Sequence, residues 1–181
     1  MIGLLVVIVV IAVVAISIYN QLVQKRFMVK EAWSGIDVQL KRRHDLVPNL
    51  VETVRGYMGH ERKVLEEVTN LRTRVMGAVN IKEKGELENN LGQALKSLFA
   101  VAEAYPNLKA NENFIQLQKQ LAEIEDQLQL ARRYYNGATR DFNILIDSFP
   151  SNIVAGLFNF RQEEFFQLES AEERKNPEVK F

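Results

Sequence analysis

The sequence contains no cysteine, only four prolines and nine glycines in 181 residues, and no excess of either charge. Without thiols the chain cannot form a disulfide, a thiolate nucleophile, or a cysteine-based zinc or iron–sulfur site. The 23 basic side chains balance the 23 acidic ones, so no general electrostatic attraction to nucleic acid is expected. A composition of 47% apolar and 25% charged residues excludes a collagen-like or wholly disordered chain and leaves room for one domain with a real core.

The sequence also lacks the short motifs of several enzyme classes. It has no GxGxxG, P-loop or GxSxG pattern, so neither nucleotide binding nor esterase chemistry is predicted. The two histidines, His44 and His60, do not have the spacing of metal ligands on one helix face. Carboxylates such as Glu66 and Glu163 lie in charged segments rather than in an apolar pocket. We therefore predict a protein that is not an enzyme, with no catalytic residue, no cofactor and no metal site.

Charge is absent from residues 2–18, where thirteen of seventeen residues are Val, Ile or Leu. A helix of that length rises about 26 Å, at the short end of what a bilayer needs. Its insertion is favourable by roughly 4 to 8 kcal/mol. A buried strand would have about three times the usual length. A cleaved signal peptide stays an alternative, because Ala15-Ile16-Ser17 is a tolerable cleavage triplet although no basic segment precedes the run. We predict that residues 1–18 form a retained, single transmembrane anchor.

Three basic residues, Lys25, Arg26 and Lys30, follow directly after the apolar run. The positive-inside rule then predicts a single-pass protein of the inner (plasma) membrane, with its N-terminus outside and the rest of the chain in the cytoplasm. These three residues are also the basic side chains nearest to the lipid headgroups. The next basic cluster, residues 41–44, lies roughly 30 Å beyond the end of the apolar run along a helix, well beyond a Debye length of about 8 Å. Membrane lipids are therefore the first predicted partner.

Beyond the anchor, apolar residues recur every three or four positions, which is the pattern of amphipathic helices. The spacing predicts two long helices, over about 19–55 and from an Asn111 or Asn113 cap to 149, and two short ones, over about 60–78 and 86–105. The polar segment 80–86 is predicted to be a loop. An unbroken helix of about 60 residues through Gly56 and Gly59 is the alternative, since an interior glycine costs only about 1 kcal/mol. The fold class is all-α: an anchor followed by an antiparallel, mostly four-helix bundle over 19–152.

Pro48 lies inside the first long helix. It removes one backbone hydrogen bond and crowds the carbonyl group of His44, so a kink or break near residue 47 is expected, at a cost of roughly 3 kcal/mol. Arg43 and His44 interrupt the apolar stripe just before it, between Leu40 and Val47.

The two long helices extend beyond the two short ones, which leaves a two-helix stalk over about 19–38 and 131–148. Apolar residues of this stalk, such as Trp33, Tyr134 and Phe142, need a cover. The aromatic C-terminal segment, 153–181, is predicted to pack back onto the bundle. Neighbouring copies of the chain are the second candidate cover, and they predict a homo-oligomer.

Charges of alternating sign, Asp37, Lys41 and Asp45, follow one another at intervals of four residues. The simplest interpretation is a solvated stripe of ion pairs on one helix face. The functional interpretation is a docking face for a partner helix. Together with Trp33, four residues further back, these side chains form the candidate interaction face.

Three runs of the sequence resemble one family of bacterial proteins. The run EAWSGIDVQLKRRHDLVPNLVETVRGYMGHE, residues 31–61, resembles the central signature of the LemA family of membrane-anchored helical proteins. Residues 102–152 look like its second signature, and the tail ERKNPEVKF resembles its C-terminus. One departure is Phe142-Asn143, where the family often has Tyr-Asn, so any role of that hydroxyl group is absent here.

The resemblance implies a short N-terminal anchor and an antiparallel, largely four-helix bundle, and it implies no established catalytic function. Members look like accessory factors, often encoded beside membrane zinc metalloproteases or other envelope proteins, and one branch takes part in building magnetosome membranes. We therefore predict a non-enzymatic, membrane-anchored scaffold that self-associates and organises a membrane patch or partner proteins. The alternative is an adaptor or regulator of a membrane metalloprotease in envelope proteostasis. No nucleic-acid partner is predicted.

Overall fold

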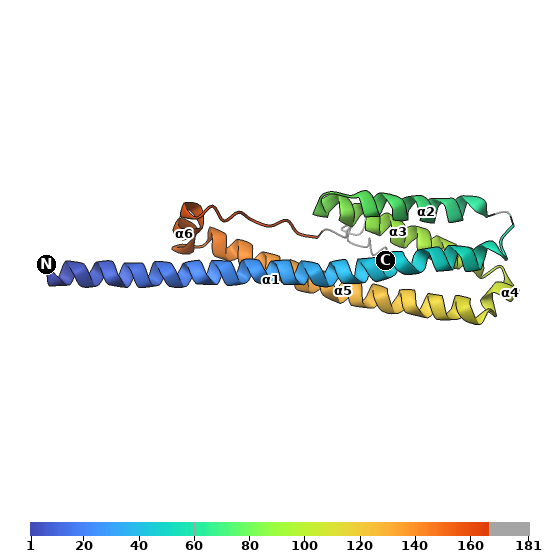
Figure 1. Ribbon diagram of the computed structural model, residues 1–181, viewed down its shortest axis with the longest axis horizontal. Coiled ribbons are helices and arrows are strands. Elements are labelled where there is room, and N and C mark those ends of the chain that lie inside the picture. The colour runs from blue at the N-terminus through green and yellow to red at the C-terminus, as the bar shows by residue number, and fades with distance from the viewer. Residues whose placement is uncertain (60, 167–181) are drawn as a thin grey trace, which may run out of the picture. The chain divides into compact units, whose positions relative to one another are not determined.

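The computed structural model describes residues 1–59 and 61–166 (Figure 1). Every regular element within these residues is a helix, and none is a strand. The all-α prediction is confirmed: a long apolar N-terminal helix is followed by a packed helical bundle. The helices are α1 (Ile2–Arg55), α2 (Arg62–Gly77), α3 (Ile81–Ala102), α4 (Pro106–Lys109), α5 (Glu112–Asp147) and α6 (Ser151–Leu157).

The chain forms two compact units. Unit 1 comprises Met1–Lys41 and Ile124–Phe165. Unit 2 comprises Arg42–Glu123 together with Phe166, the last residue that the structure describes. The two long helices, α1 and α5, each contribute one part to both units. The last fifteen residues of the predicted C-terminal segment, 167–181, and His60 lie outside the described residues.

Helix α1 runs without a break from Ile2 to Arg55, so the apolar run and the first predicted bundle helix are one element. Pro48 lies inside it. Because Pro48 has no N–H group, the carbonyl oxygen of His44 loses its usual donor within the helix. Arg72 of α2 replaces that donor: its Nε donates to the His44 carbonyl oxygen at 2.8 Å. A break near residue 47 therefore does not occur, whereas the kink stays a prediction.

The remaining helix boundaries include two corrections. The unbroken helix through Gly56 is wrong, because the N–H groups of Tyr57 and Met58 both turn back to the carbonyl oxygen of Val54 and α1 ends there. The loop predicted over 80–86 is also wrong, because α3 starts at Ile81. The side chain of Asn80 caps it by accepting from the N–H group of Glu83 at 2.7 Å.

The start of α5 resolves a choice that the sequence left open. Asn111 is the residue that caps this helix, with its Oδ1 accepting from the N–H group of Phe114 at 3.1 Å. A polar side chain in this position satisfies one of the free amide groups at a helix start.

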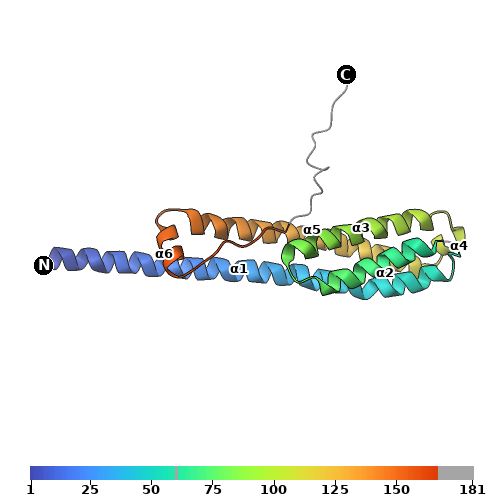
Figure 2. The ribbon, with the colours of Figure 1, turned by 90° about the horizontal axis from the view of Figure 1, so that it is seen from above.

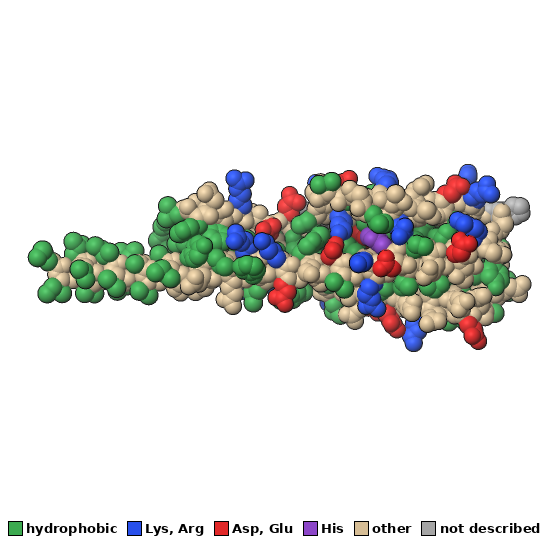
Figure 3. All heavy atoms as spheres, in the orientation of Figure 1, with side chains coloured by type: hydrophobic (Ala, Val, Ile, Leu, Met, Phe, Trp, Pro, Cys, Tyr) green, Lys and Arg blue, Asp and Glu red, His purple; other side chains and the backbone are tan. Residues whose placement is uncertain are grey.

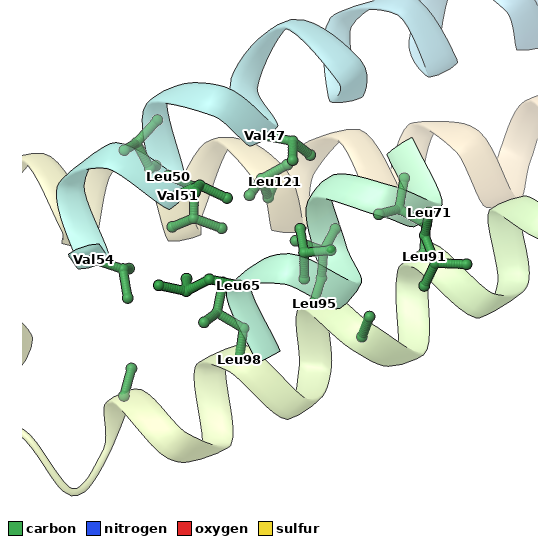
Figure 4. Close-up of a cluster of buried hydrophobic side chains, with 14 of the residues drawn as sticks. Val47, Leu50, Val51, Val54, Leu65, Leu71, Leu91, Leu95, Leu98 and Leu121 are labelled. Carbon is green, nitrogen blue, oxygen red and sulfur yellow. The ribbon is translucent and has the colours of Figure 1, made fainter. Parts of the chain in front are cut away.

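Unit 2 is built from the end of α1, from α2 and α3, and from the start of α5. These segments run antiparallel and are joined by short connections (Figures 1 and 2). Leucine and valine side chains from all four converge between the helices, as Figure 4 shows. Burying one such side chain contributes about 1.5–3 kcal/mol, so this cluster is the main stabilising element of unit 2. Its labelled members are Val47, Leu50, Val51, Val54, Leu65, Leu71, Leu91, Leu95, Leu98 and Leu121.

Unit 1 has fewer helices around its core. The N-terminal part of α1 lies antiparallel to the C-terminal part of α5 (Figure 2). Beyond α5 the chain turns into α6, and residues 158–165, which we call the return segment, run back along the two long helices (Figure 2). Apolar residues from each part are buried here: Leu22, Val29, Ile36 and Leu40 of α1, Ile124, Leu128, Tyr135 and Phe142 of α5, Val154 and Ala155 of α6, and Phe160.

Candidate functional site

The first seventeen residues of α1 present apolar side chains to the surroundings. This helix contains a segment that is long and apolar enough to cross a membrane, and none of that segment is buried within the protein. Hydrophobic side chains dominate the surface of this segment, and the first Lys and Arg side chains lie beyond it (Figure 3). An exposed apolar surface of this extent is typical of contact with lipid rather than with water.

The three predicted membrane-flanking residues all lie in unit 1, and each contacts another side chain. Lys25 Nζ lies 3.6 Å from Asp141 Oδ2. The Arg26 guanidinium lies 5.1 Å from the centre of the Phe160 ring. Lys30 Nζ lies 5.7 Å from the centre of the Phe27 ring. The first two contacts join α1 to α5 and to the return segment. Lys25 and Arg26 therefore hold parts of unit 1 together in addition to placing positive charge beyond the apolar segment.

Asp141 is the acidic partner within this basic group. Hydrogen bonds from the Arg140 guanidinium, at 3.2 and 3.3 Å, hold the pKa of the Asp141 carboxyl below its usual value. Slight burial acts against this, and the charge of Lys25 lowers the pKa further. Asp141 is therefore ionised at neutral pH and balances part of the local positive charge.

The candidate interaction face is only partly available on the surface. Trp33 is half-buried, and its ring packs edge-on against Tyr135 at a centroid distance of 5.5 Å. Asp37, Lys41 and Asp45 are exposed, with Asp45 in unit 2 and the others in unit 1. Trp33 thus contributes to packing inside unit 1, while the charged stripe remains accessible.

Two polar side chains of α5 hold the return segment in place. Asn143 donates from Nδ2 to the carbonyl oxygen of Glu163 and accepts at Oδ1 from the N–H group of the same residue, both at 2.9 Å. The Tyr135 hydroxyl donates to the carbonyl oxygen of Glu164 at 2.8 Å. Burial raises the pKa of Tyr135, which keeps its hydroxyl a neutral donor. Sequence reasoning missed these contacts, because the accepting groups are backbone atoms and carry no side-chain pattern.

A charged cluster lies inside unit 2 and was not predicted. Glu88 of α3 is fully buried, and its carboxylate contacts Arg43 Nη1 at 3.4 Å and His44 Nε2 at 2.6 Å. We call Arg43, His44 and Glu88 the buried cluster. Gly92, one turn after Glu88, makes room for it: an added Cβ would lie 3.0 Å from Arg43 Nη2. The cluster ties α1 to α3 by charge and hydrogen bonds.

The sequence did contain a signal for the buried cluster. Arg43 and His44 occupy the apolar stripe of their helix between Leu40 and Val47. Glu88 lies three residues before Leu91 and seven before Leu95, on the buried stripe of α3. Residues of opposite charge at core positions of two neighbouring helices predict a buried pair, since an isolated buried charge is too costly.

A polar groove of about 570 Å³ lies between α2 and α3. Its lining includes Lys63, Glu66, Glu67, Arg74, Asn90 and Gln93, so both charge signs are mixed along it. Small-molecule sites are usually mostly apolar, with a few converging polar groups. Over the described parts of the chain, no three His, Asp or Glu side chains are grouped so as to hold a metal ion.

Comparison with known proteins assigns the chain to a family. The model of the LemA family matches residues 32–181. The chain belongs to the LemA family.

Relatives of this LemA-family protein include magnetosome proteins. It is 26% identical to the magnetosome proteins MamQ 1 and MamQ 2 of Paramagnetospirillum magneticum over 179 residues, with 84% of this chain and 66% of each relative covered. It is likewise 26% identical to the protein LemA of Metamycoplasma hominis over 154 residues, with 84% of this chain and 70% of the relative covered. This LemA-family chain thus spans just under two thirds of the length of the two MamQ relatives.

The region that the LemA family model matches, residues 32–181, contains parts of both units. It includes the buried cluster, the candidate interaction face and the return segment. The family match does not include the apolar segment or the three basic residues after it, Lys25, Arg26 and Lys30, which all lie in α1 before residue 32.

Proposed function

We propose that this LemA-family protein is a non-enzymatic, membrane-anchored helical scaffold that self-associates and organises a membrane patch or partner proteins. The observation that carries the proposal is the apolar segment of α1, which no part of the described protein covers. The buried cluster supports a structural rather than a catalytic role, because the Glu88 carboxylate is closed off from any substrate. That two relatives are named magnetosome proteins fits a role at a membrane.

We place the N-terminus outside the inner membrane and the chain from residue 19 onward on its cytoplasmic side. Lys25, Arg26 and Lys30, directly after the apolar segment, support this orientation by the positive-inside rule. Protease added to intact spheroplasts should leave the chain whole, and lysed spheroplasts should lose it. Digestion of most of the chain in intact spheroplasts would contradict the orientation.

Exposed apolar side chains of unit 1 support self-association. Phe27 and Val38 are exposed on α1, eleven residues apart, and therefore lie on one side of that helix. Leu130, Tyr134 and Ile144 are exposed on one side of α5 by the same helical spacing. Such surfaces on a membrane-bound helix pair fit contact between copies of the chain.

The oligomeric state of the full chain in mild detergent and in nanodiscs tests this part of the proposal. Light scattering should give an assembly larger than one chain. Replacement of Leu130 and Tyr134 together by Asp should shift it to a monomer, whereas Gln129→Glu, on an exposed neighbouring position of α5, should not. A wild-type protein that is monomeric at every concentration would contradict self-association.

The alternative function is an adaptor or regulator of a membrane metalloprotease. It is supported by the stripe Asp37, Lys41 and Asp45, whose side chains of alternating charge are exposed on the surface of α1. A photo-crosslinker placed at Lys41 should then capture a membrane protease in cells, and one placed at Lys109 should not. Crosslinking that recovers no protease above background from either position would remove this alternative.

A further inference from the structure

The turn between α5 and α6 lies beside the end of the apolar segment of α1. Tyr19, the first residue after that segment, packs its ring against Phe158 at a centroid distance of 4.7 Å and against Phe160 at 5.9 Å. Figure 2 shows α6 folded against α1 at the end of α5. Within unit 1, the far end of the α5–α6 hairpin is therefore level with the point where the apolar segment ends.

This end of the hairpin is uncharged, and its outer side chains are large and apolar. No ionisable side chain occurs between Asp147 and Arg161. Hydrophobic side chains gather on the surface around α6 (Figure 3). Four of them form what we call the tip surface, with these exposed fractions: Phe149 81%, Ile153 55%, Leu157 73% and Phe158 58%. Single exposed apolar side chains are ordinary, but four within ten residues are typical of an interaction site.

Two backbone hydrogen bonds fix the direction of the chain at the end of α6. Helix α6 ends at Leu157, and Asn159, two residues later, lies in the left-handed region at φ 54°. The N–H group of Phe160 donates to the carbonyl oxygen of Ala155 at 2.9 Å, and that of Asn159 donates to Gly156 at 3.3 Å. This is the hydrogen-bond pattern of a Schellman cap. It turns the chain so that Phe160 is buried while Phe158, two residues earlier, stays exposed.

We propose that the tip surface inserts into the boundary between headgroups and acyl chains of the same bilayer that α1 crosses. The inference rests on the proposed anchoring of α1. A helix that leaves the bilayer at Tyr19 places everything level with Tyr19 in the interfacial layer, where aromatic and aliphatic side chains are favoured. The tip surface is continuous with the anchor through the contact between Tyr19 and Phe158. That continuity favours lipid over a second copy of the chain.

Cations stand next to the tip surface, as an interfacial site requires. Arg26 lies over the ring of Phe160, two residues after Phe158 of the tip surface, and Lys25 pairs with Asp141, six residues before the end of α5. An apolar patch with basic side chains directly behind it matches lipid acyl chains with anionic headgroups above them. The protein then has two attachments to one membrane, a spanning helix and a shallow wedge. Two attachments limit how far the α5–α6 hairpin can tilt or rotate about the spanning helix.

The absence of cysteine makes this placement directly measurable. Single cysteines are introduced at Ile153 or Leu157 of the tip surface, at Val10 of the apolar segment, and at Gln127 on the exposed side of α5. Each full-length variant is labelled with the fluorophore NBD. It is then reconstituted into vesicles of phosphatidylcholine and phosphatidylglycerol. Quenching is read with iodide in the water and with spin-labelled lipids of shallow or deep label position.

Labels at Ile153→Cys and Leu157→Cys should be quenched by the shallow lipid label and be several-fold less accessible to iodide than the label at Gln127→Cys. The label at Val10→Cys should be quenched by the deep lipid label. If Val10→Cys behaves so while both tip positions are as accessible to iodide as Gln127→Cys, the wedge is refuted and the anchor stands. If Val10→Cys is accessible to iodide, the proposed anchoring itself fails. Tip labels shielded from iodide but not quenched by lipid would assign the surface to a second copy and also refute the wedge.

Discussion

Units 1 and 2 share the helices α1 and α5 but bury them differently. In unit 2 the two segments are closed in by α2 and α3, and aliphatic side chains from four helices meet in one core. In unit 1, within the described part of the chain, the other segments of these helices have α6 and the return segment beside them, and aromatic rings such as Phe142 and Phe160 fill the space. The comparison teaches that the number of neighbouring helices, rather than the apolar stripe itself, decides how much apolar surface remains exposed.

The units also differ in how they bury polar groups. Unit 2 buries opposite charges against one another in the buried cluster. Unit 1 fastens its return segment mainly with neutral donors and acceptors, Tyr135 and Asn143, bound to backbone groups. Arg132 of unit 1 is buried, but its acidic neighbour Glu125 lies 4.0 Å away and is half exposed. Loss of one partner should therefore cost more in unit 2 than in unit 1.

The largest expected effect comes from removing the carboxylate of the buried cluster. Glu88→Ala should destabilise unit 2 by about 3–5 kcal/mol, because the buried side chains of Arg43 and His44 lose the carboxylate that both contact. Urea denaturation of the full chain in mild detergent measures this. Trp33, the one tryptophan of the sequence, lies in unit 1, so its fluorescence follows that unit while circular dichroism follows all helices. In Glu88→Ala, the loss of helical circular dichroism should begin at a lower urea concentration than the change in Trp33 fluorescence.

Glu125→Ala is the matched control in unit 1. This substitution should lower the free energy of unfolding by no more than about 1 kcal/mol, as for other partly exposed ion pairs. Equal costs for Glu88→Ala and Glu125→Ala would break the distinction between the units.

An intermediate effect is expected where α2 supports the proline in α1. Arg72→Ala should cost about 1–3 kcal/mol, because the carbonyl oxygen of His44 is then left without a donor. In a Pro48→Ala background the new N–H group at position 48 can donate to that oxygen, so Arg72→Ala should cost clearly less. A double-mutant cycle from urea denaturation measures the coupling. Additive costs would show that Arg72 does not compensate for Pro48.

A smaller effect separates two helical glycines. Gly137→Ala in unit 1 adds a methyl group into open space on α5 and should stabilise the protein by about 0.5–1 kcal/mol. Gly92→Ala in unit 2 should bring no gain or a loss, because its Cβ would press on the Arg43 guanidinium. Thermal denaturation of both variants is the measurement. Equal gains at the two positions would show that the buried cluster has room to move.

The smallest effect concerns Asp141. The folded state lowers the pKa of the Asp141 carboxyl, so its interactions stabilise unit 1 at pH values above its ordinary pKa of 3.8. This stabilisation is lost as the pH falls through the folded-state pKa. Arg140→Ala should raise the pKa of Asp141, and Lys25→Ala should raise it less. Carboxyl titration by nuclear magnetic resonance measures both. Lys41→Ala, roughly 24 Å further along α1 than Lys25, should leave the value unchanged.

Particular residues show how far the sequence predicts the fold. The heptad spacing from Phe114 to Phe149 predicted α5 almost to its ends, because helical periodicity is a local property of the chain. The segment 80–86 was misread as a loop, since its polarity concealed the Asn80 cap that starts α3. The continuity of α1 through Pro48 was not predictable from the helix alone, because the compensating donor, Arg72, belongs to another helix.

The sequence by itself determined where the chain is apolar, where it is helical and where its positive charge follows the apolar segment, because each of these depends on neighbours along the chain. Only the tertiary structure decided that Glu88 is a buried counter-charge, that Asn143 holds the return segment, and that Phe158 lies beside Tyr19. These facts depend on contacts between residues from 20 to 139 positions apart, such as Asn143 with Glu163 and Tyr19 with Phe158, or on the burial that such contacts create. Hydrogen bonds, ion pairs and desolvation act over a few ångströms in space, and no local pattern in a sequence specifies which distant residues come that close.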